Sequence, residues 1–173
     1  DGFAFTDYNA VTNAWHYEAL KLMEGIAGAL DKQDDATFYA SESDAFKKRF
    51  IRSFFNARKG YFTDGLASDT DHASLHGNMF PLAFDLVPAG KKQNVVDFIQ
   101  TRGMACSVYG SQFLMDALYE ANDAEYALHM LTKTDDRSWY NMIRVGSTIS
   151  LEAWDNKYKP NQDWNHAWGA APA

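Results

Sequence analysis

Apolar residues recur at helical spacing through most of the chain, and the first stretch shows the pattern plainly. Its large apolar side chains are separated by four or seven residues, which places them on one face of an α-helix. These positions are Val11, Trp15, Leu22 and Ile26. The spacing predicts a helix over roughly 8–29, and Thr6 or Asp7 could cap its first turn with a side-chain oxygen.

The next segment, DDATFYASESDAFKKRFIRSFFNARKG, predicts a second helix over about 34–58 that ends at Gly60. Its basic residues alternate with apolar ones. The basic residues are Lys47, Lys48, Arg49, Arg52, Arg58 and Lys59, and the apolar ones are Phe46, Phe50, Ile51, Phe54 and Phe55. This alternation indicates a solvated face opposite an apolar stripe. The two helices should form an antiparallel αα-hairpin.

Shorter helices are predicted along the rest of the chain. One should be capped by Asp69 or Thr70 and kinked by Pro81, because proline lacks the N–H donor that an inner helical turn needs. Another, in GKKQNVVDFIQTRG, should close at Gly103. The first of these helices is predicted over 70–86. Three more are predicted over 107–121, 123–132 and 137–144.

The helices repeat in pairs. GNMFPLAFDL from Gly77 resembles GSQFLMDALY from Gly110, 33 residues later, and a shorter apolar helix follows each. Paired helices at such a period form either an open solenoid or a closed α/α toroid. A solenoid has polar terminal repeats, whereas neither end of this chain is polar. We therefore expect an all-α domain over 1–173, in which antiparallel helix pairs form about half of a larger ring, truncated at both ends.

Composition and charge exclude several classes of function. Hydrophobic residues make up 46% of the 173 residues, enough for a single domain with a core. A net charge of −7 argues against nucleic-acid binding, and no apolar run approaches the roughly 20 residues of a membrane span. No Cys/His spacing matches a zinc site, so no metal or cofactor is expected. The lone cysteine, Cys106, is interpreted as a small buried residue.

The segment after residue 144 is different in character. VGSTISLEAW is β-branched and extended, and a long irregular loop over about 145–165 follows it. Aromatic residues cluster around this loop: Trp139, Trp154, Tyr158, Trp164 and Trp168. Aromatic faces suit the C–H faces of sugar rings, and Glu152 is the natural candidate for a general base in glycoside hydrolysis. The alternative is that the tryptophans only pin the loop and Glu152 points to solvent.

This region resembles the α-L-rhamnosidase family of glycoside hydrolases, which are inverting enzymes with an (α/α)6 toroid. The family pattern is a Ser-Trp pair, then Gly, two small residues, Glu-x-Trp-Asp and a later Asn-His. The matching residues here are Ser138, Trp139, Gly146, Ser147, Thr148, Glu152, Trp154, Asp155, Asn165 and His166. The helical segments NAVTNAWHYEALKLMEGIAGAL and YGSQFLMDALYEANDAEYALHML also look like helices of that toroid.

The resemblance implies roles for individual residues. Glu152 matches the catalytic base that activates water, and His166 matches a histidine that contacts the rhamnose. Trp139 and Trp154 match aromatic positions around the sugar pocket. The implied partners are a rhamnose-containing oligosaccharide or glycoside and the remainder of the parent toroid, with neither nucleic acid nor membrane.

One departure from the family is important. The acidic motif that carries the family's general acid lies upstream of the helix that resembles residues 9–30, and this chain has no such stretch. Its densest polar cluster, SDTDHASLHGN, is explained by helix capping, and His72 and His76 lie four apart without the glutamate of a metal-binding HEXXH motif. We expect a chain that supplies the base of a rhamnosidase site and is inactive alone. Another toroid glycosidase, or a noncatalytic carbohydrate-binding or scaffold piece, remains the alternative.

Overall fold

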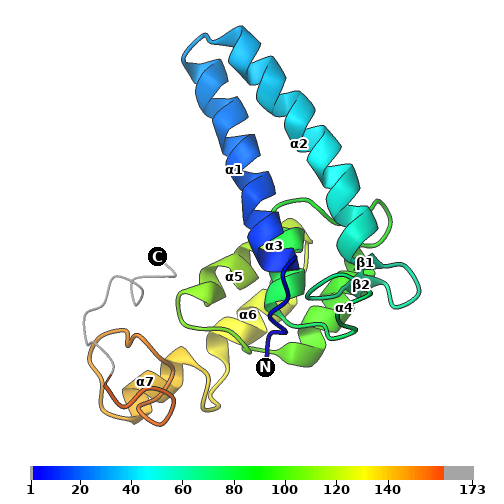
Figure 1. Ribbon diagram of the computed structural model, residues 1–173. Helices are drawn as coiled ribbons and strands as arrows, with labels where there is room; N and C mark the ends of the chain where they lie inside the picture. The colour runs from blue at the N-terminus through cyan, green and yellow to red at the C-terminus, as the bar shows by residue number, and fades with distance from the viewer. Residues whose placement is uncertain (1, 162–173) are drawn as a thin grey trace.

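The computed structural model describes residues 2–161, and the regular secondary structure of this part of the chain is mostly helical (Figure 1). Seven helices and one two-stranded antiparallel hairpin make up this part of the chain. In order they are α1 (Ala10–Ala29), α2 (Gln33–Phe54), β1 (Phe55–Asn56), β2 (Tyr61–Phe62), α3 (His76–Ala83), α4 (Lys92–Arg102), α5 (Gly110–Glu120), α6 (Ala124–Thr132) and α7 (Trp139–Arg144). The prediction of an all-α fold is confirmed.

Helices α1 and α2 pair along their length as the predicted αα-hairpin and stand away from the other helices as a long arm (Figure 1). The predicted caps Thr6 and Asp7 are wrong, because α1 is capped by Asn9, whose Oδ1 accepts from the Thr12 N–H at 2.8 Å. The next residue, Ala10, donates its backbone N–H to the Asp64 carbonyl at 2.8 Å. A contact with a distant segment therefore fixes where this helix starts.

The second helix ends at Phe54, before its predicted end at about 58, and a β-hairpin follows. Asn56 starts the turn, since its Oδ1 accepts from the backbone N–H groups of Arg58 and Lys59. Gly60 completes it with a φ of +84°, a conformation that favours glycine. The hairpin is bound to α3 by Asn78, whose amide contacts both the N–H and the carbonyl of Phe62.

The basic residues of α2 face solvent, as predicted, while Phe50 and Phe54 are buried in the core. Lys47 forms an ion pair with Asp85 at 3.0 Å across the surface. This pattern confirms a solvated basic face opposite an apolar stripe.

The third helix begins at His76, later than the predicted start near residue 70, and Asp69 and Thr70 do not cap it. The reason is the buried carboxylate of Asp64, which accepts from the N–H and the hydroxyl of Ser74 at 2.9 and 2.7 Å. These bonds hold the segment before the helix in an irregular conformation.

The later helices agree closely with the predictions. Pro81 lies inside α3, and α4 closes at Gly103, which has a φ of +56°. Helices α5, α6 and α7 begin within three residues of their predicted starts. The extended character predicted for VGSTISLEAW does not produce a regular strand within the described residues.

The core lies where α3 packs between α1 and α5, with α4 and α6 outside this row. Its largest fully buried side chains are Phe50, Phe62, Leu75, Met79, Leu82, Leu86, Ile99, Met104, Leu114, Leu118, Met130 and Leu151. The row of α1, α3 and α5, each followed by a helix that runs back, is the arrangement that a toroid of helical hairpins requires.

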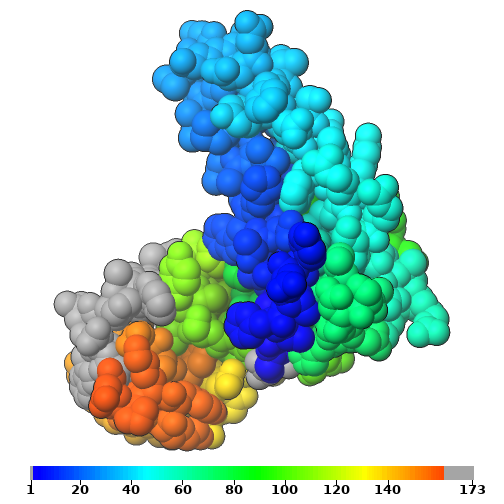
Figure 2. All heavy atoms as spheres, in the orientation of Figure 1, coloured from blue at the N-terminus to red at the C-terminus, as the bar shows by residue number. Residues whose placement is uncertain are grey.

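The arm carries apolar surface on its outer side. Figure 2 shows it as a column that rises from the body formed by the later helices. On α1, Leu22 is 57% exposed and Ile26 is 52% exposed, and Leu30, directly after the helix, is also exposed. No helix among residues 2–161 has both the length and the hydrophobicity that a bilayer crossing requires.

Candidate active site

A cavity of about 470 Å³ opens where four segments of the chain meet. The start of α3, the α4–α5 connection, the α6–α7 connection and the loop after α7 all contribute side chains. The lining residues are His76, Ala105, Cys106, Ser107, Arg137, Glu152, Ala153, Trp154, Tyr158 and Lys159. A cavity of this volume can hold a small organic ligand.

Glu152 lies in the wall of this cavity. It is only 8% exposed, so the alternative in which its carboxylate simply points into bulk solvent does not hold. The ammonium of Lys159 forms an ion pair with its Oε1 atom. An ionised carboxylate is the form that can accept a proton.

The two predicted tryptophans lie together but differ in position. Trp154 lines the cavity, is 3% exposed and donates its indole N–H to the carbonyl of Cys106 at 2.7 Å. Trp139 packs edge-on against Trp154, with ring centroids 5.0 Å apart and planes at 87°. Trp139 is not among the described residues that line the cavity. Trp139 therefore reaches the described wall of the cavity through its contact with Trp154.

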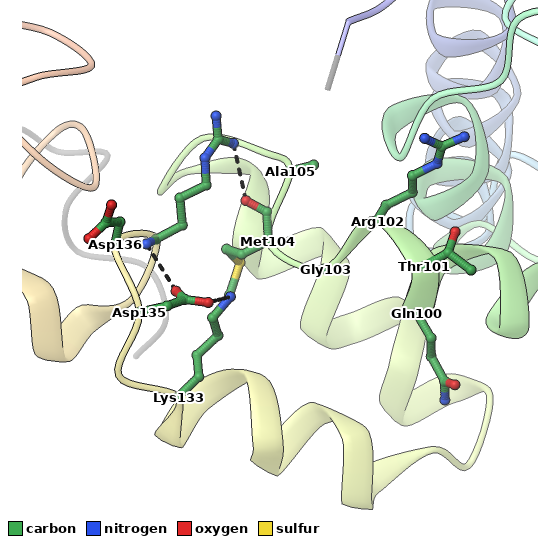
Figure 3. Close-up of a pocket in the computed structure, with 10 residues that line it drawn as sticks. Gln100, Thr101, Arg102, Gly103, Met104, Ala105, Lys133, Asp135 and Asp136 are labelled. Atoms are coloured by element: carbon green, nitrogen blue, oxygen red, sulfur yellow. Dashed lines mark hydrogen bonds and ion pairs between the residues drawn. The ribbon is translucent and has the colours of Figure 1, made fainter.

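A larger cavity of about 850 Å³ adjoins the first (Figure 3). The end of α4 and the residues after it (100–105) form one side, and the α6–α7 connection forms the other. Ala105 and Arg137 line both cavities. The two cavities therefore share a wall.

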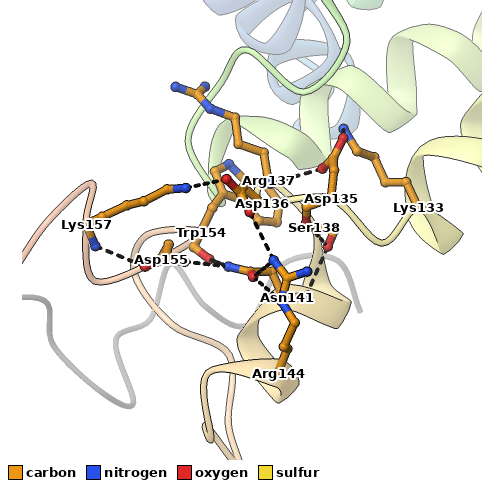
Figure 4. A network of polar contacts seen from close by, with 10 residues as sticks. All are labelled: Lys133, Asp135, Asp136, Arg137, Ser138, Asn141, Arg144, Trp154, Asp155 and Lys157. Atoms are coloured by element: carbon orange, nitrogen blue, oxygen red, sulfur yellow. Dashed lines mark hydrogen bonds and ion pairs between the residues drawn. The ribbon is translucent and has the colours of Figure 1, made fainter.

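A network of polar contacts fixes the loop that carries Glu152 to the start of α7 (Figure 4). Asn141, buried on α7, donates from its amide to the Trp154 carbonyl and to the Asp155 carboxylate, both at 2.9 Å. Asp136 binds Arg144 at 3.0 Å and also Lys157 on the loop. The loop is irregular, yet these contacts fix its path and hence the position of Glu152.

These contacts also change the titration of the two aspartates. The hydrogen bond from the Lys157 ammonium is the main cause that lowers the pKa of Asp136. The backbone N–H of Lys157, followed by the Asn141 amide, lowers the pKa of Asp155. Both carboxylates remain ionised at neutral pH and keep the loop bound.

Three cavity residues were not predicted to act there: His76, Arg137 and Lys159. The guanidinium of Arg137 lies over the Tyr158 ring, 4.9 Å from its centroid, and donates to the Met104 carbonyl at 3.3 Å. The aromatic cluster in the sequence included Tyr158, but no sequence spacing indicates that Arg137 or His76 reaches the same cavity.

His76 presents a neutral imidazole to the cavity at neutral pH. Burial lowers its pKa, and the nearby carboxylate of Asp64 opposes that effect only in part. His72 instead contacts Asp64, with 2.6 Å between Nδ1 and Oδ2. Within residues 2–161 no group of three or more His, Cys, Asp or Glu side chains is placed to hold a metal ion.

Cys106 is buried, as predicted, and its burial raises the pKa of the thiol to about 12. The thiol is thus protonated and unreactive at neutral pH. The predicted sugar contact His166 lies outside the described residues, as do Asn165, Trp164 and Trp168.

The described lining residues offer one carboxylate, one ammonium, one guanidinium, a neutral imidazole and two aromatic rings. A carboxylate there can take a proton from water, and the other polar groups can bind hydroxyls. Hydrolysis with inversion needs two carboxyl groups about 6.5–9.5 Å apart. Glu152 is the only carboxylate among the described lining residues.

Comparison with known proteins gives a consistent result. The sequence model described as the bacterial alpha-L-rhamnosidase 6 hairpin glycosidase domain matches residues 1–173. No curated protein matches the chain. Among solved structures, the α-L-rhamnosidase of Aspergillus terreus is similar over 90% of this chain, with a TM-score of 0.67 and 20% identity. That of Dictyoglumus thermophilum is similar over 83%, with a TM-score of 0.68 and 22% identity.

These matches show the fold. The described helices correspond to part of a helical toroid, as predicted from the paired pattern. The chain spans only 18% and 16% of the two solved proteins.

Proposed function

This chain belongs to the family of bacterial α-L-rhamnosidase six-hairpin glycosidase domains, and from that premise we propose that it supplies the catalytic base of an inverting α-L-rhamnosidase. The substrate is a terminal α-L-rhamnosyl group on an oligosaccharide or other glycoside. Glu152 is the base, and the chain works as part of a longer polypeptide that completes the toroid.

The position of Glu152 carries this proposal. Its carboxylate is nearly buried, lines a cavity of about 470 Å³ and lies beside the Lys159 ammonium. A carboxylate of purely structural value would have its oxygens turned into the protein, as those of Asp64 are. A carboxylate exposed to a ligand-sized space can instead act on a water molecule in that space.

The reaction proceeds in a single displacement. Glu152 takes a proton from a water molecule, and the water oxygen forms a bond to the anomeric carbon of rhamnose. The bond from that carbon to the leaving oxygen breaks on the opposite face, and a general acid gives the leaving oxygen a proton. The first product is therefore β-L-rhamnose, the opposite anomer to the substrate.

The cavity walls suit the sugar. The neutral imidazole of His76 can accept from one hydroxyl or donate to another, and Arg137 can donate to an oxygen. The ring of Tyr158, 44% exposed, offers a face to the C–H groups of the sugar. We assign His166 a further sugar contact and Trp139 and Trp154 the support of this wall.

The general acid comes from a part of the enzyme outside this chain. The 173-residue chain alone is then expected to leave an aryl α-L-rhamnoside intact, while a longer polypeptide with upstream residues hydrolyses it. Equal rates for the two would refute the divided site.

The proposal is tested by Glu152→Gln in the full-length enzyme. The amide keeps the size of the side chain but cannot take a proton, so kcat should fall by about 10³-fold or more while rhamnose binding is kept. Kinetics on an aryl α-L-rhamnoside and calorimetry with rhamnose measure the two effects. Glu42→Gln, an exposed change on α2, is the matched control.

Other outcomes identify the alternatives. Unchanged turnover by the Glu152→Gln enzyme would support a scaffold role for this chain. A panel of aryl glycosides in which another sugar is cleaved faster than rhamnose would support a different toroid glycosidase.

A further inference from the structure

A lysine of the loop after α7 reaches back to the candidate base. Lys159 lies seven residues after Glu152, and its ammonium donates a hydrogen bond to the Glu152 Oε1 atom and forms an ion pair with it. Both side chains line the cavity of about 470 Å³. Lys159 has no part in the reaction as described so far.

We propose that Lys159 is a positioning residue, whose ammonium holds the charged Glu152 carboxylate in the orientation in which it takes a proton from the attacking water. The inference rests on the proposed function, because it concerns the same base. It adds a residue that the family motif does not include, since Lys159 lies between the Glu-x-Trp-Asp block and the later Asn-His pair.

The nearly buried position of Glu152 creates the need for such a partner. Its side chain is 8% exposed, and moving an ionised carboxylate out of water costs free energy unless an opposite charge or hydrogen-bond donors replace the water. The Lys159 side chain is 48% exposed, so its ammonium can keep contact with water while it bonds the carboxylate. The pair therefore supplies a counter-charge from the solvent side of Glu152.

The contact also leaves the carboxylate able to act as a base. A carboxylate has two oxygens with about four acceptor positions, and one hydrogen bond from an ammonium uses one of them. The cavity of about 470 Å³ is present with the lysine in place, so there is room for a water molecule beside the pair. Lys159 can thus fix the carboxyl group while Glu152 accepts a proton at another position.

The neighbours of Lys159 restrain its backbone. The ring of Tyr158, the preceding residue, lies against the Arg137 guanidinium, 4.9 Å from the ring centroid. Pro160 follows, and the residue before a proline is largely excluded from helical backbone angles. These restraints reduce the conformational entropy that the lysine loses when it pairs with Glu152.

Two other roles of the lysine lead to different expectations. A lysine that binds the sugar directly would matter whether or not the base is present. A lysine that only anchors the loop would change the stability of the protein more than the chemical step. A lysine that acts through Glu152 should matter only when Glu152 is there.

The test removes the ammonium in two backgrounds of the full-length enzyme. With Glu152 present, Lys159→Met should lower kcat for an aryl α-L-rhamnoside by about tenfold or more and change KM by less than about twofold, because the contact orients the base for the transition state. In Glu152→Ala, azide can form a bond to the anomeric carbon as the bond to the leaving oxygen breaks, and no base is needed. There Lys159→Met should change the azide-dependent rate by less than about twofold.

Two variants are the controls. Lys159→Arg keeps a positive hydrogen-bond donor at this single contact and should retain kcat within about threefold. Lys21→Met removes a lysine of similar exposure, 41%, from an ion pair with Glu24 on α1, and it should leave kcat unchanged in both backgrounds. Calorimetry gives the melting temperature of each variant, and the rates are compared well below it.

Three results would overturn the positioning role. They are an unchanged kcat in Lys159→Met, an equal loss in both backgrounds, which would mean that the lysine acts on the sugar, and a loss in Lys159→Arg as large as that in Lys159→Met. Failure of the proposed function is seen separately, in variants that keep Lys159: Glu152→Gln would retain full turnover, or azide would not restore cleavage by Glu152→Ala.

Discussion

At the scale of residues, two buried carboxylates, Asp64 and Glu152, differ in their surroundings. Asp64 is fully buried and accepts from the backbone N–H groups of Ala4 and Ser74, from the Ser74 hydroxyl and from His72. Its oxygens are occupied by the chain itself, and it organises the segment before α3. Glu152 faces a cavity, which leaves room for water and a ligand beside it.

His76 gives a prediction at the same scale. Burial lowers its pKa below the ordinary value of 6.5, so between the two values the unfolded chain binds a proton that the folded chain resists. The free energy of unfolding therefore falls as the pH decreases through this window. In His76→Gln this contribution is absent, and the wild-type chain should lose more stability than the variant between pH 7.5 and 5.5.

Urea denaturation of both proteins at the two pH values measures the effect. The comparison cancels the other titrating groups, which the two proteins share. Parallel losses of stability in wild type and variant would mean that His76 is not held neutral by burial.

At the scale of elements, one side chain caps the first turn of α1. Asn9 accepts from the Thr12 N–H, so Asn9→Ala should lower the free energy of unfolding by about 1 kcal/mol. Lys32 occupies the same cap position in α2 but makes no side-chain capping bond, so Lys32→Ala should cost almost nothing. Chemical denaturation gives both values, and equal losses would contradict the capping role.

Helical periodicity predicts the elements well because each helix buries a face along its own length. It fails at the end of α2, where Asn56 accepts from the Arg58 N–H and starts the turn of a β-hairpin. It also fails at the start of α3, where Asp64 holds the preceding segment through Ser74. The site shows the same division. The local motif indicates Glu152 and Trp154, which both line the cavity, whereas tertiary packing alone brings Arg137 to it.

At the scale of the whole molecule, the arm formed by α1 and α2 exposes apolar side chains. Leu22 and Ile26 lie one helical turn apart on α1, and both are more than half exposed. We propose that the rest of the toroid covers them in the full-length enzyme.

This proposal predicts two effects of one double variant. Leu22→Gln with Ile26→Gln should reduce self-association of the isolated chain, because polar side chains replace the apolar surface that would drive it. The same pair should lower the melting temperature of the full-length enzyme, because buried apolar contacts are lost. Sedimentation and calorimetry measure the two, and an unchanged melting temperature would show that the arm is uncovered there as well.

The most direct test of the account is chemical rescue of Glu152→Ala in the full-length enzyme. Truncation removes the base and leaves space where the attacking water would lie, so azide, which needs no deprotonation, should restore cleavage of an aryl α-L-rhamnoside. The account predicts β-L-rhamnosyl azide as the product, identified by NMR, with no such product from the wild type. A rate that azide does not restore, or an α-linked azide, would contradict a base at Glu152 that acts on the face opposite the leaving group.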